Sequence, residues 1–346
     1  MAFIFADSFE TITATSSMTD RGWTLSGTPI LETVIFKDGT QCVSIEANEN
    51  IQQNTGAGAN KIVFASFWFY KDHEDQAIFF RFRGGGSGEL NLRVETDDTV
   101  DIIDQASTNL GSSAAVLTSD VWHHIEFKGV FKNSIAANDV QLKIDGILEI
   151  TVTTATDTQF STDDTITKIE LESDNEVAKK NFFDSFIMWD EVAGDDWNDF
   201  RGQLRIETKA ADANGPDTGF NGSDGNSINN YLQSDEINDL HDSDTTYNEH
   251  GAAGTKDSYN FPNMVATDIG SIVGVQVAMV SKKTDTGAAD LTPFFVDGGT
   301  DKLGTEHVLT NGTYTFGSHL WDENPESVAA WTESDITTGN FGLKVT

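Results

Sequence analysis

Residues 62–70 read Ile62-Val63-Phe64-Ala65-Ser66-Phe67-Trp68-Phe69-Tyr70. Successive side chains of a β-strand point to opposite sides of its sheet, and here both sets of side chains are largely apolar. A strand that is apolar on both sides belongs in the middle of a structure that covers it twice. The stretch therefore predicts a central strand of a β-sandwich.

Two half-buried strands follow this run. Residues 78–83 place one isoleucine and two phenylalanines on one side and two arginines on the other, and residues 90–95 alternate Leu or Val with Asn, Arg and Glu. This alternation predicts strands with one buried and one polar face. The glycine-rich segment 84–88 between them lacks the Lys-Ser/Thr pair of a phosphate-binding loop and leads into a strand, so it predicts a hairpin turn.

Short strands continue along the chain to Trp189. They are expected at residues 123–130, 140–144, 147–152, 166–171 and 182–189. Asp145-Gly146 lies between two of them and favours a tight hairpin. Many short strands separated by Gly, Asn and Asp turns predict a sandwich or jelly roll.

The composition changes after Trp189, because residues 190–199 hold five carboxylates and predict a connector. Beyond it we expect a loop at 210–230 and a short helix at 324–331, with Asn324 as its N-cap and Pro325 in its first turn. Strands are expected at residues 203–208, 273–279, 294–296, 306–309 and 341–345. We therefore predict an all-β chain with a jelly roll at 1–198 and a smaller β-rich domain at 199–346.

The charge balance excludes several classes of partner. The 346 residues carry 56 acidic and 21 basic side chains, a net charge of -35, and the acidic excess runs through both halves. Such a surface repels a nucleic-acid backbone, and the most apolar stretch, 269–280, is too short for a membrane helix. A single cysteine, Cys42, excludes an intramolecular disulfide and a CxxC zinc site. We expect neither nucleic-acid binding nor membrane insertion.

Two segments resemble the concanavalin A-like (laminin-G-type) jelly roll of lectins and glucanases. Residues 122–127 begin a strand with Trp122 and lead to the hairpin that closes at Asp145-Gly146. Residues 181–187, Asn-Phe-Phe-Asp-Ser-Phe-Ile, match the closing strand of that family. The resemblance implies this fold for the N-terminal domain.

The two ends of the chain and its connector are similar to virion proteins of tailed bacteriophages that carry this jelly roll at their N-terminus. The similar residues are 3–10, Trp23, 197–208, 321–325, 331–332 and 341–345. The resemblance implies a non-enzymatic structural component of the virion, with other virion proteins and further copies of itself as partners, and a C-terminal domain for attachment or assembly. We expect a tail-associated protein, made in the host bacterial cytoplasm, with a host surface glycan as a further partner.

Three alternatives stay open. The same sequence suits a capsid decoration or head-fibre protein, and the fold suits a bacterial cell-surface sugar-binding module, although the first residues do not read as a secretory signal. The third alternative is a polysaccharide-cleaving enzyme. Glu172, Asp174 and Glu176 fit the E-x-D-x-E spacing of laminarinase-type glycoside hydrolases, which are built on the same jelly roll. The polar residues between them favour a solvated turn, so we expect no catalytic residue.

The jelly-roll resemblance also implies a structural Ca²⁺, with loop carboxylates as its ligands. The candidates are Asp7, Asp38, Asp145 and Asp184. The competing interpretation is that these residues only shape turns. A weaker metal candidate is His241-Asp242-Ser243-Asp244 together with His250. No other cofactor is expected.

Overall fold

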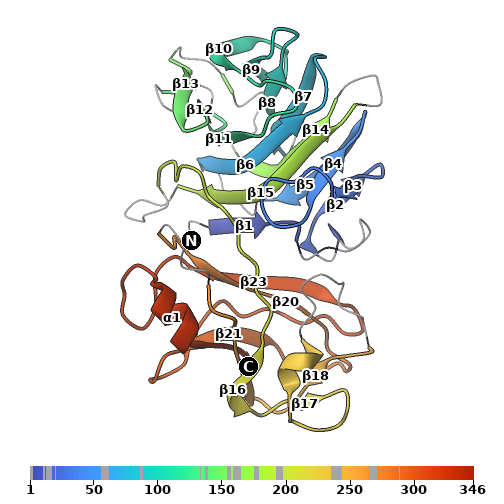
Figure 1. Ribbon diagram of the computed structural model, residues 1–346, viewed down its shortest axis with the longest axis vertical. Coiled ribbons are helices and arrows are strands. Elements are labelled where there is room, and N and C mark those ends of the chain that lie inside the picture. Colours follow the sequence, from blue (N-terminus) through green and yellow to red (C-terminus); the bar gives the residue numbers. More distant parts are fainter. Residues whose placement is uncertain are drawn as a thin grey trace. The chain divides into compact units, whose positions relative to one another are not determined.

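The chain divides into two compact units, residues 1–207 and 208–346 (Figure 1). The structure, a computed structural model, describes residues 3–10, 12, 18–19, 21–55, 62–85, 89–132, 134–136, 139–153, 157–158, 165–174, 179–191, 198–234, 244–264, 271–287 and 289–346. The chain is all-β, as the sequence predicted, and the first unit is a jelly-roll sandwich of two antiparallel sheets.

Sheet A of the first unit has eight strands. Their order is β13 (Ile147–Thr151), β12 (Gln141–Ile144), β11 (His123–Gly129), β6 (Val63–Lys71), β15 (Asn181–Asp190), β4 (Cys42–Ile45) and β3 (Ile30–Glu32), with β1 (Phe3–Asp7) also paired to β15. Asp145 and Gly146 join β12 to β13 with positive φ angles of 51° and 82°. This is the tight hairpin that the sequence predicted.

Sheet B packs against sheet A and has seven strands. Their order is β10 (Asn109–Val116), β9 (Thr99–Asp104), β8 (Glu89–Val94), β7 (Ala77–Gly84), β14 (Ile166–Ser173), β5 (Glu49–Asn54) and β2 (Thr24–Ser26). The glycine-rich segment 84–88 joins β7 to β8, which are antiparallel partners, and its residues 86–88 lie outside the described part of the chain.

The core of the sandwich is aromatic and centres on β6, which lies between β11 and β15. The Phe67 ring stacks on Phe80 of β7 with centroids 5.2 Å apart, and Phe69 stacks on Phe79 at 4.3 Å. Phe64 points to the other side of sheet A and is also fully buried. The prediction of a central strand covered on both faces is confirmed.

Residues 198–202 lie on the outer face of sheet A. The Phe200 ring meets Phe64 edge-on with centroids 5.5 Å apart. The carboxylate of Glu126 on β11 accepts the backbone N–H groups of Arg201 and Gly202 at 2.9 and 2.8 Å. These contacts hold the chain beyond residue 198 to the first unit, which extends to Glu207.

The second unit has one larger sheet and two small ones. The five-stranded sheet has the order β16 (Ala213–Thr218), β19 (Lys256–Asn260), β24 (Asn340–Val345), β21 (Leu291–Val296) and β22 (Lys302–Leu303). The two-stranded sheets pair β17 (Asn221–Gly222) with β18 (Asn248–Glu249), and β20 (Val275–Ser281) with β23 (Thr315–Trp321). A short 3₁₀ turn, η2, spans Asn230–Gln233. A buried cluster of Phe295, Trp321, Trp331 and Phe341 forms a core.

Several expectations for the chain beyond residue 198 are wrong. Residues 203–208 and 306–309 form no strand, apart from one isolated bridge at His307, because alternation alone does not supply a neighbouring strand. The expected loop at 210–230 contains β16 and β17.

The helix expected at 324–331 is also wrong. The Asn324 side chain accepts the N–H groups of Glu326 and Ser327 as an N-cap does, but Val328 adopts a φ of +53° and ends the turn. The N–H of Asn324 then closes the loop on the carbonyl of Ala329. The helix α1 (Glu333–Thr338) begins instead after Thr332, which forms a capping box with Asp335.

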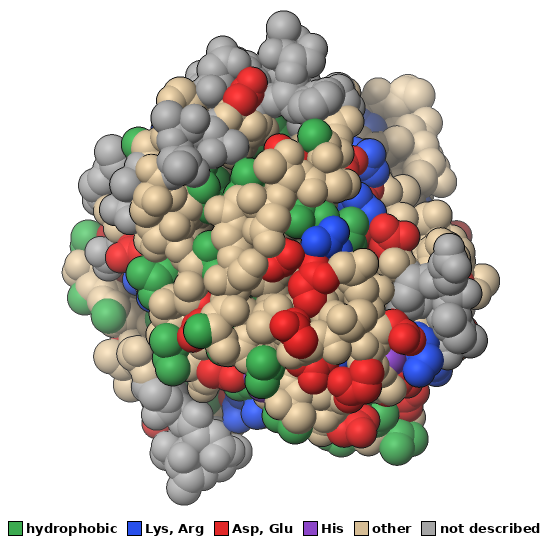
Figure 2. Space-filling view, turned by 90° about the horizontal axis from the view of Figure 1, so that it is seen from above, with side chains coloured by type: hydrophobic (Ala, Val, Ile, Leu, Met, Phe, Trp, Pro, Cys, Tyr) green, Lys and Arg blue, Asp and Glu red, His purple; other side chains and the backbone are tan. Residues whose placement is uncertain are grey.

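Acidic side chains are spread widely over the face drawn in Figure 2, with fewer basic ones among them. This distribution agrees with the net charge. Within the described residues, no helix is both long and apolar enough to cross a membrane. Part of the most apolar stretch, from Val275, forms β20.

Candidate functional site

The outward side chains of sheet B are mostly polar, with Ile103 opposite Asn91 and Ile78 opposite Arg93 as exceptions, and we call the polar ones the polar face of sheet B. The inward neighbours of these residues, such as Phe80, Leu92 and Leu171, are fully buried, so strand alternation turns the polar groups outward. The face consists of Asn50 and Gln52 on β5, Lys168, Glu170 and Glu172 on β14, Arg81 and Arg83 on β7, Glu89, Asn91 and Arg93 on β8, and Asp101 on β9. None of these side chains is aromatic.

Arg81 lies at the centre of this face and donates hydrogen bonds to three acidic residues. Its Nε donates to Glu172 at 2.5 Å, its Nη1 to Glu89 at 3.1 Å and its Nη2 to Asp174 at 3.2 Å. The planar guanidinium presents several donors at once, which suits it to such a position. Arg81 therefore fixes three carboxylates from β8 and the end of β14.

Arg83 repeats this arrangement one step along β7. Its Nη1 donates to Glu170 at 2.8 Å, and its Nη2 lies 3.0 Å from Glu89. Two guanidiniums thus face four carboxylates, of which the Glu170 side chain is only 2% exposed. The carboxylates outnumber the guanidiniums, and the buried ones are Glu170 and Glu172, whereas Asp174 and Arg83 are exposed.

Burial has a clear effect on Glu172. Desolvation of the charged form raises the pKa of this carboxyl to about 8, although the ion pair with Arg81 acts in the opposite direction. The neighbouring charges of Glu170 and Asp174 raise it further. Burial thus favours the protonated form of Glu172, whereas Arg81 favours the charged form and sets the position of the carboxyl.

Asn91 lies beside Arg81 in the middle of the polar face. It pairs with Arg81 on β7 and with Ile103 on β9, and it is 2% exposed. Its side-chain oxygen is buried and accepts no hydrogen bond. A buried acceptor without a donor costs free energy, so this oxygen is an unsatisfied polar group beneath the surface of the face.

Two of the three carboxylates in the E-x-D-x-E pattern contact Arg81. Glu172 is on β14, Asp174 follows the strand, and both contact Arg81. Glu176 lies outside the described residues. The sequence pattern identified the two described carboxylates but not their neighbours Arg81, Glu89 and Glu170. These residues come together because β14 lies beside β7 in the sheet, and the alternation within a single strand does not reveal which strand is its neighbour.

Three of the four candidate Ca²⁺ ligands, Asp7, Asp145 and Asp184, use their carboxylates to accept hydrogen bonds from other groups of the protein. The Asp7 carboxylate accepts the Phe9 N–H and the Trp23 indole N–H, at 2.8 and 2.9 Å. Asp145 accepts the backbone N–H of His124 and lies 2.8 Å from His123 Nδ1.

Asp184 also accepts hydrogen bonds from the backbone. Its carboxylate accepts the backbone N–H groups of Lys37 and of the fourth candidate, Asp38, at 2.9 and 3.1 Å. Burial raises its pKa to about 7. Across the described part of the chain no three His, Cys, Asp or Glu side chains are grouped as a metal site, so these residues do not fit a shared Ca²⁺.

The described residues of the histidine-containing loop form no metal site either. His241 and Asp242 lie outside the described residues. Asp244 accepts hydrogen bonds from Lys282 and from the Tyr314 hydroxyl, and His250 Nδ1 accepts the N–H of Ala252. The described members of this group thus have partners within the protein.

The chain was compared with known proteins. No family model and no curated protein matches it. Solved structures similar to it include domain 4 of the extracellular arabinanase AbnA from Geobacillus stearothermophilus, in complex with arabinotriose, at 14% identity and a TM-score of 0.41 over 54% of this chain and 92% of that one.

Two further solved structures cover a similar share of the chain. A carbohydrate esterase from the Shiga toxin-encoding bacteriophage phi24B has 14% identity and a TM-score of 0.38 over 55% of this chain and 99% of that one. The carbohydrate-binding module CBM66 from Bacillus subtilis has 11% identity and a TM-score of 0.34 over 49% and 95%. Likenesses at this level do not establish a shared function.

Proposed function

We propose that the protein is a non-enzymatic structural component of a bacteriophage virion, associated with the tail, and that its jelly-roll unit binds a glycan. The observation that carries the glycan-binding part is the polar face of sheet B, on which Arg81 and Arg83 hold four carboxylates in fixed positions. The virion part is supported by the resemblance of residues 3–10 and 197–208 to phage virion proteins. The partners are then other virion proteins, further copies of the chain and a host surface glycan.

The polar face suits recognition of hydroxyl groups. Its amides and charged groups offer donors and acceptors at positions fixed by two adjacent strands, β7 and β8. Arginine and carboxylate side chains that already bind each other stay in place when a ligand arrives, so little side-chain entropy is lost on binding. Without an aromatic side chain on this face, affinity would depend on hydrogen bonds rather than stacking.

Binding to the polar face is tested with the full chain and an array of bacterial surface polysaccharides. We expect Asn91→Leu and Arg83→Gln each to weaken binding to the best glycan at least tenfold, because each removes a hydrogen-bonding group from the face. The matched control is Lys132→Gln, whose side chain is exposed to a similar degree, 34% against 37% for Arg83, and pairs with Asp139 away from this face. Equal binding by all three variants would overturn the site.

The virion assignment is tested separately by electron microscopy of particles labelled with an antibody against residues 1–200. Label on the tail supports the proposal. Label over the head makes the protein a capsid decoration or head-fibre protein. Particles that carry no label would exclude a place in the virion.

A second candidate, a polysaccharide-cleaving enzyme, is favoured by one observation. A carboxyl with a pKa near 8 keeps a proton at neutral pH, as a general acid must, and Glu172 has this property. Against it, Arg81 holds the Glu172 carboxylate at 2.5 Å. Reducing-end release from the polysaccharide that binds best, lost in Glu172→Gln but kept in Asp174→Asn, would favour the enzyme.

A further inference from the structure

The connector lies on the outer face of sheet A without joining a sheet. Residues 198–212 belong to no helix or strand, whereas β11 and β12 beneath are paired with their neighbours by backbone hydrogen bonds. A segment outside the sheets is held by individual contacts, and such segments open at a lower free energy than core strands. We call residues 198–202 the strap.

Two anchors hold the strap on the sheet. The Phe200 ring meets the buried Phe64 ring edge-on, with centroids 5.5 Å apart. One carboxylate oxygen of Glu126 accepts the N–H groups of Arg201 and Gly202 at 2.9 and 2.8 Å. Successive N–H groups that converge on one oxygen form a small anion-binding concavity. Gly202 has a φ of +76°, which glycine adopts without strain, so the backbone can turn both N–H groups toward this oxygen.

A lysine from the neighbouring strand contacts the strap as well. Lys143 on β12 lies opposite Glu126 in the strand register, and its Nζ is 4.4 Å from the centre of the Phe200 ring. The attraction between an ammonium and an aromatic face is modest where solvent has access. Lys143 therefore lies beside both anchors and adds a weak contact to them.

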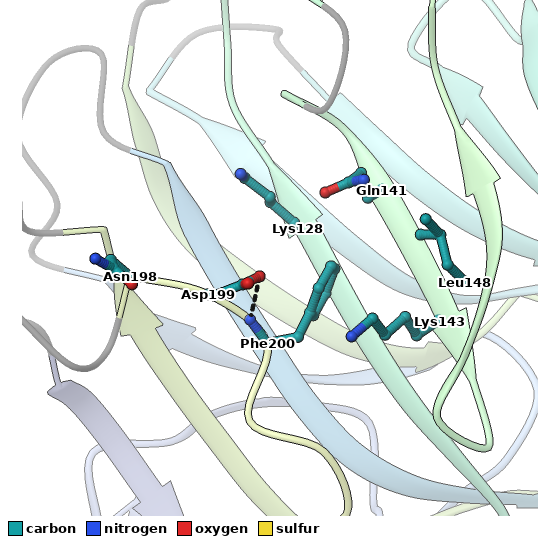
Figure 3. Close-up of a pocket in the computed structure, with 7 residues that line it drawn as sticks. All are labelled: Lys128, Gln141, Lys143, Leu148, Asn198, Asp199 and Phe200. Atoms are coloured by element: carbon teal, nitrogen blue, oxygen red, sulfur yellow. Dashed lines mark hydrogen bonds between the residues drawn. The ribbon is translucent and has the colours of Figure 1, made fainter.

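One side of the strap borders open space. A hollow of about 420 Å³ lies between the strap and the β12–β13 hairpin (Figure 3). Its lining includes three residues of the strap and three of the strands, which are Asn198, Asp199, Phe200, Lys128, Lys143 and Leu148. Phe200 is half-buried, whereas Phe64 is fully buried. A ring beside a hollow has fewer packing partners than a ring in a close-packed core, so the first anchor is weaker than a core contact.

The second anchor carries a cost. Glu126 is fully buried, and its second carboxylate oxygen accepts no hydrogen bond from the described residues. Desolvation raises the pKa of this carboxyl, although the N–H of Gly202 and the charge of Lys143 act in the opposite direction. An unsatisfied buried acceptor costs free energy, which is recovered when water reaches it. Opening of the strap would therefore lose two hydrogen bonds but hydrate both oxygens of Glu126.

The strap thus combines individual anchors, a half-buried ring beside a hollow and an unsatisfied acceptor beneath it. We propose that the strap opens by itself while the jelly-roll sandwich stays folded, and that opening exposes Glu126 and the Phe64 ring. The strap is then a conformational device that covers and uncovers part of the outer face of sheet A. Opening does not depend on glycan binding or on a place in a virion, because the contacts involved lie within sheet A and the connector.

The test is native-state proteolysis of the full chain with trypsin at increasing urea concentrations, with the fragments identified by mass spectrometry. In the wild type, cleavage after Arg201 should change little with urea, because local opening exposes little surface. Cleavage after Lys143 in β12 should rise steeply with urea, because that bond becomes accessible only when the sandwich unfolds.

Two variants test the anchors. Glu126→Gln removes the charge that the two N–H groups bind, and Phe200→Ala removes the ring. Each should speed cleavage after Arg201 by about tenfold, because each raises the population of the open strap. Cleavage after Lys143 should stay at the wild-type rate in both.

The matched control is Glu149→Gln on β13. Glu149 also accepts two backbone N–H groups, those of Ala114 and Ala115 on β10, both at 3.0 Å. This variant loses the same kind of charge and the same kind of contact at another place. It should leave the rate of cleavage after Arg201 unchanged.

Three results would overturn the proposal. Parallel urea dependence of cleavage after Arg201 and after Lys143 would show that the strap opens only with the sandwich. Cleavage after Arg201 that is as fast in the native protein as in the urea-unfolded chain would show that the strap is not docked. Equal rates in the wild type and both anchor variants would show that these anchors do not hold it. A variant that unfolds is recognised by faster cleavage after Lys143, and the urea dependence of the wild type then decides.

Discussion

Lys71, at the end of β6, carries a charge in the interior of the first unit. Its ammonium donates to the Asp98 carboxylate at 2.6 Å, to the Ser119 hydroxyl at 2.8 Å and to the His73 carbonyl at 2.7 Å, and 1% of its side chain is exposed. These three acceptors come from three different loops. Lys71 therefore ties together the turns at one end of the sandwich.

We expect Lys71→Met to lower the free energy of unfolding of the first unit by about 3 kcal/mol, because it leaves the carboxylate of Asp98 without its partner. The measurement is native-state hydrogen exchange of the β6 amides. Lys179→Met is the matched control, since Lys179 and Asp75 form an exposed pair at 3.7 Å, and it should cost less than about 1 kcal/mol. Equal losses in the two variants would show that the buried pair contributes no more than a surface pair.

Among single residues, the sequence pattern identified Glu172 and Asp174 but predicted that they belong to a solvated turn. Glu172 is instead 6% exposed at the end of a strand, because β14 runs two residues further than its apolar alternation. The arginines were visible as the polar side of the 78–83 alternation. Which carboxylates they would bind depends on the pairing of β14 with β7, two strands separated by about half of the jelly roll.

Among the elements, the β12–β13 hairpin tests the turn chemistry most directly. Gly146 has a φ of +82°, and a Cβ added there would meet no atom within 4 Å. Gly146→Ala should therefore cost about 1–2 kcal/mol through the backbone alone. Gly85→Ala is the control, because that glycine has no positive φ and its added Cβ makes an ordinary contact at 3.8 Å with Thr167. Thermal unfolding by calorimetry compares the two, and an equal fall in Tm would contradict this account.

The same comparison shows which elements sequence patterns specify. The long apolar run of β6 and the Asp-Gly hairpin were predicted because each carries its own local signal, a two-sided apolar pattern and a pair of residues that tolerate positive φ. In the second unit, Asn324-Pro325 predicted a helix that Val328 ends at a φ of +53°, a value rare for a β-branched residue. The capping box of Thr332 and Asp335 was the better signal for where the helix begins.

On the scale of the whole molecule, buried carboxyls set how stability depends on pH. Burial raises the pKa of Glu172 from 4.5 to about 8 and that of Asp184 from 3.8 to about 7. Between the unfolded and folded values the folded state binds more protons, so stability falls as pH rises. His124 acts in the opposite direction, because burial lowers its pKa from 6.5 to about 4. Between pH 6.5 and 4 the unfolded state binds more protons at this group, so the free energy of unfolding falls as the pH falls.

Above pH 6.5 the carboxyls therefore dominate, and we expect the free energy of unfolding of the first unit to fall by about 2–3 kcal/mol between pH 6.5 and 8.5. This free energy is measured at each pH from urea unfolding, with hydrogen exchange of the β14 amides as the readout for the first unit. Glu172→Gln is neutral at every pH and should flatten most of this slope, whereas Glu46→Gln, which alters an exposed pair with Lys180, should keep it. If Glu172→Gln kept the full slope, the titrating group would lie elsewhere, and the case for Glu172 as a proton-carrying acid would fail with it.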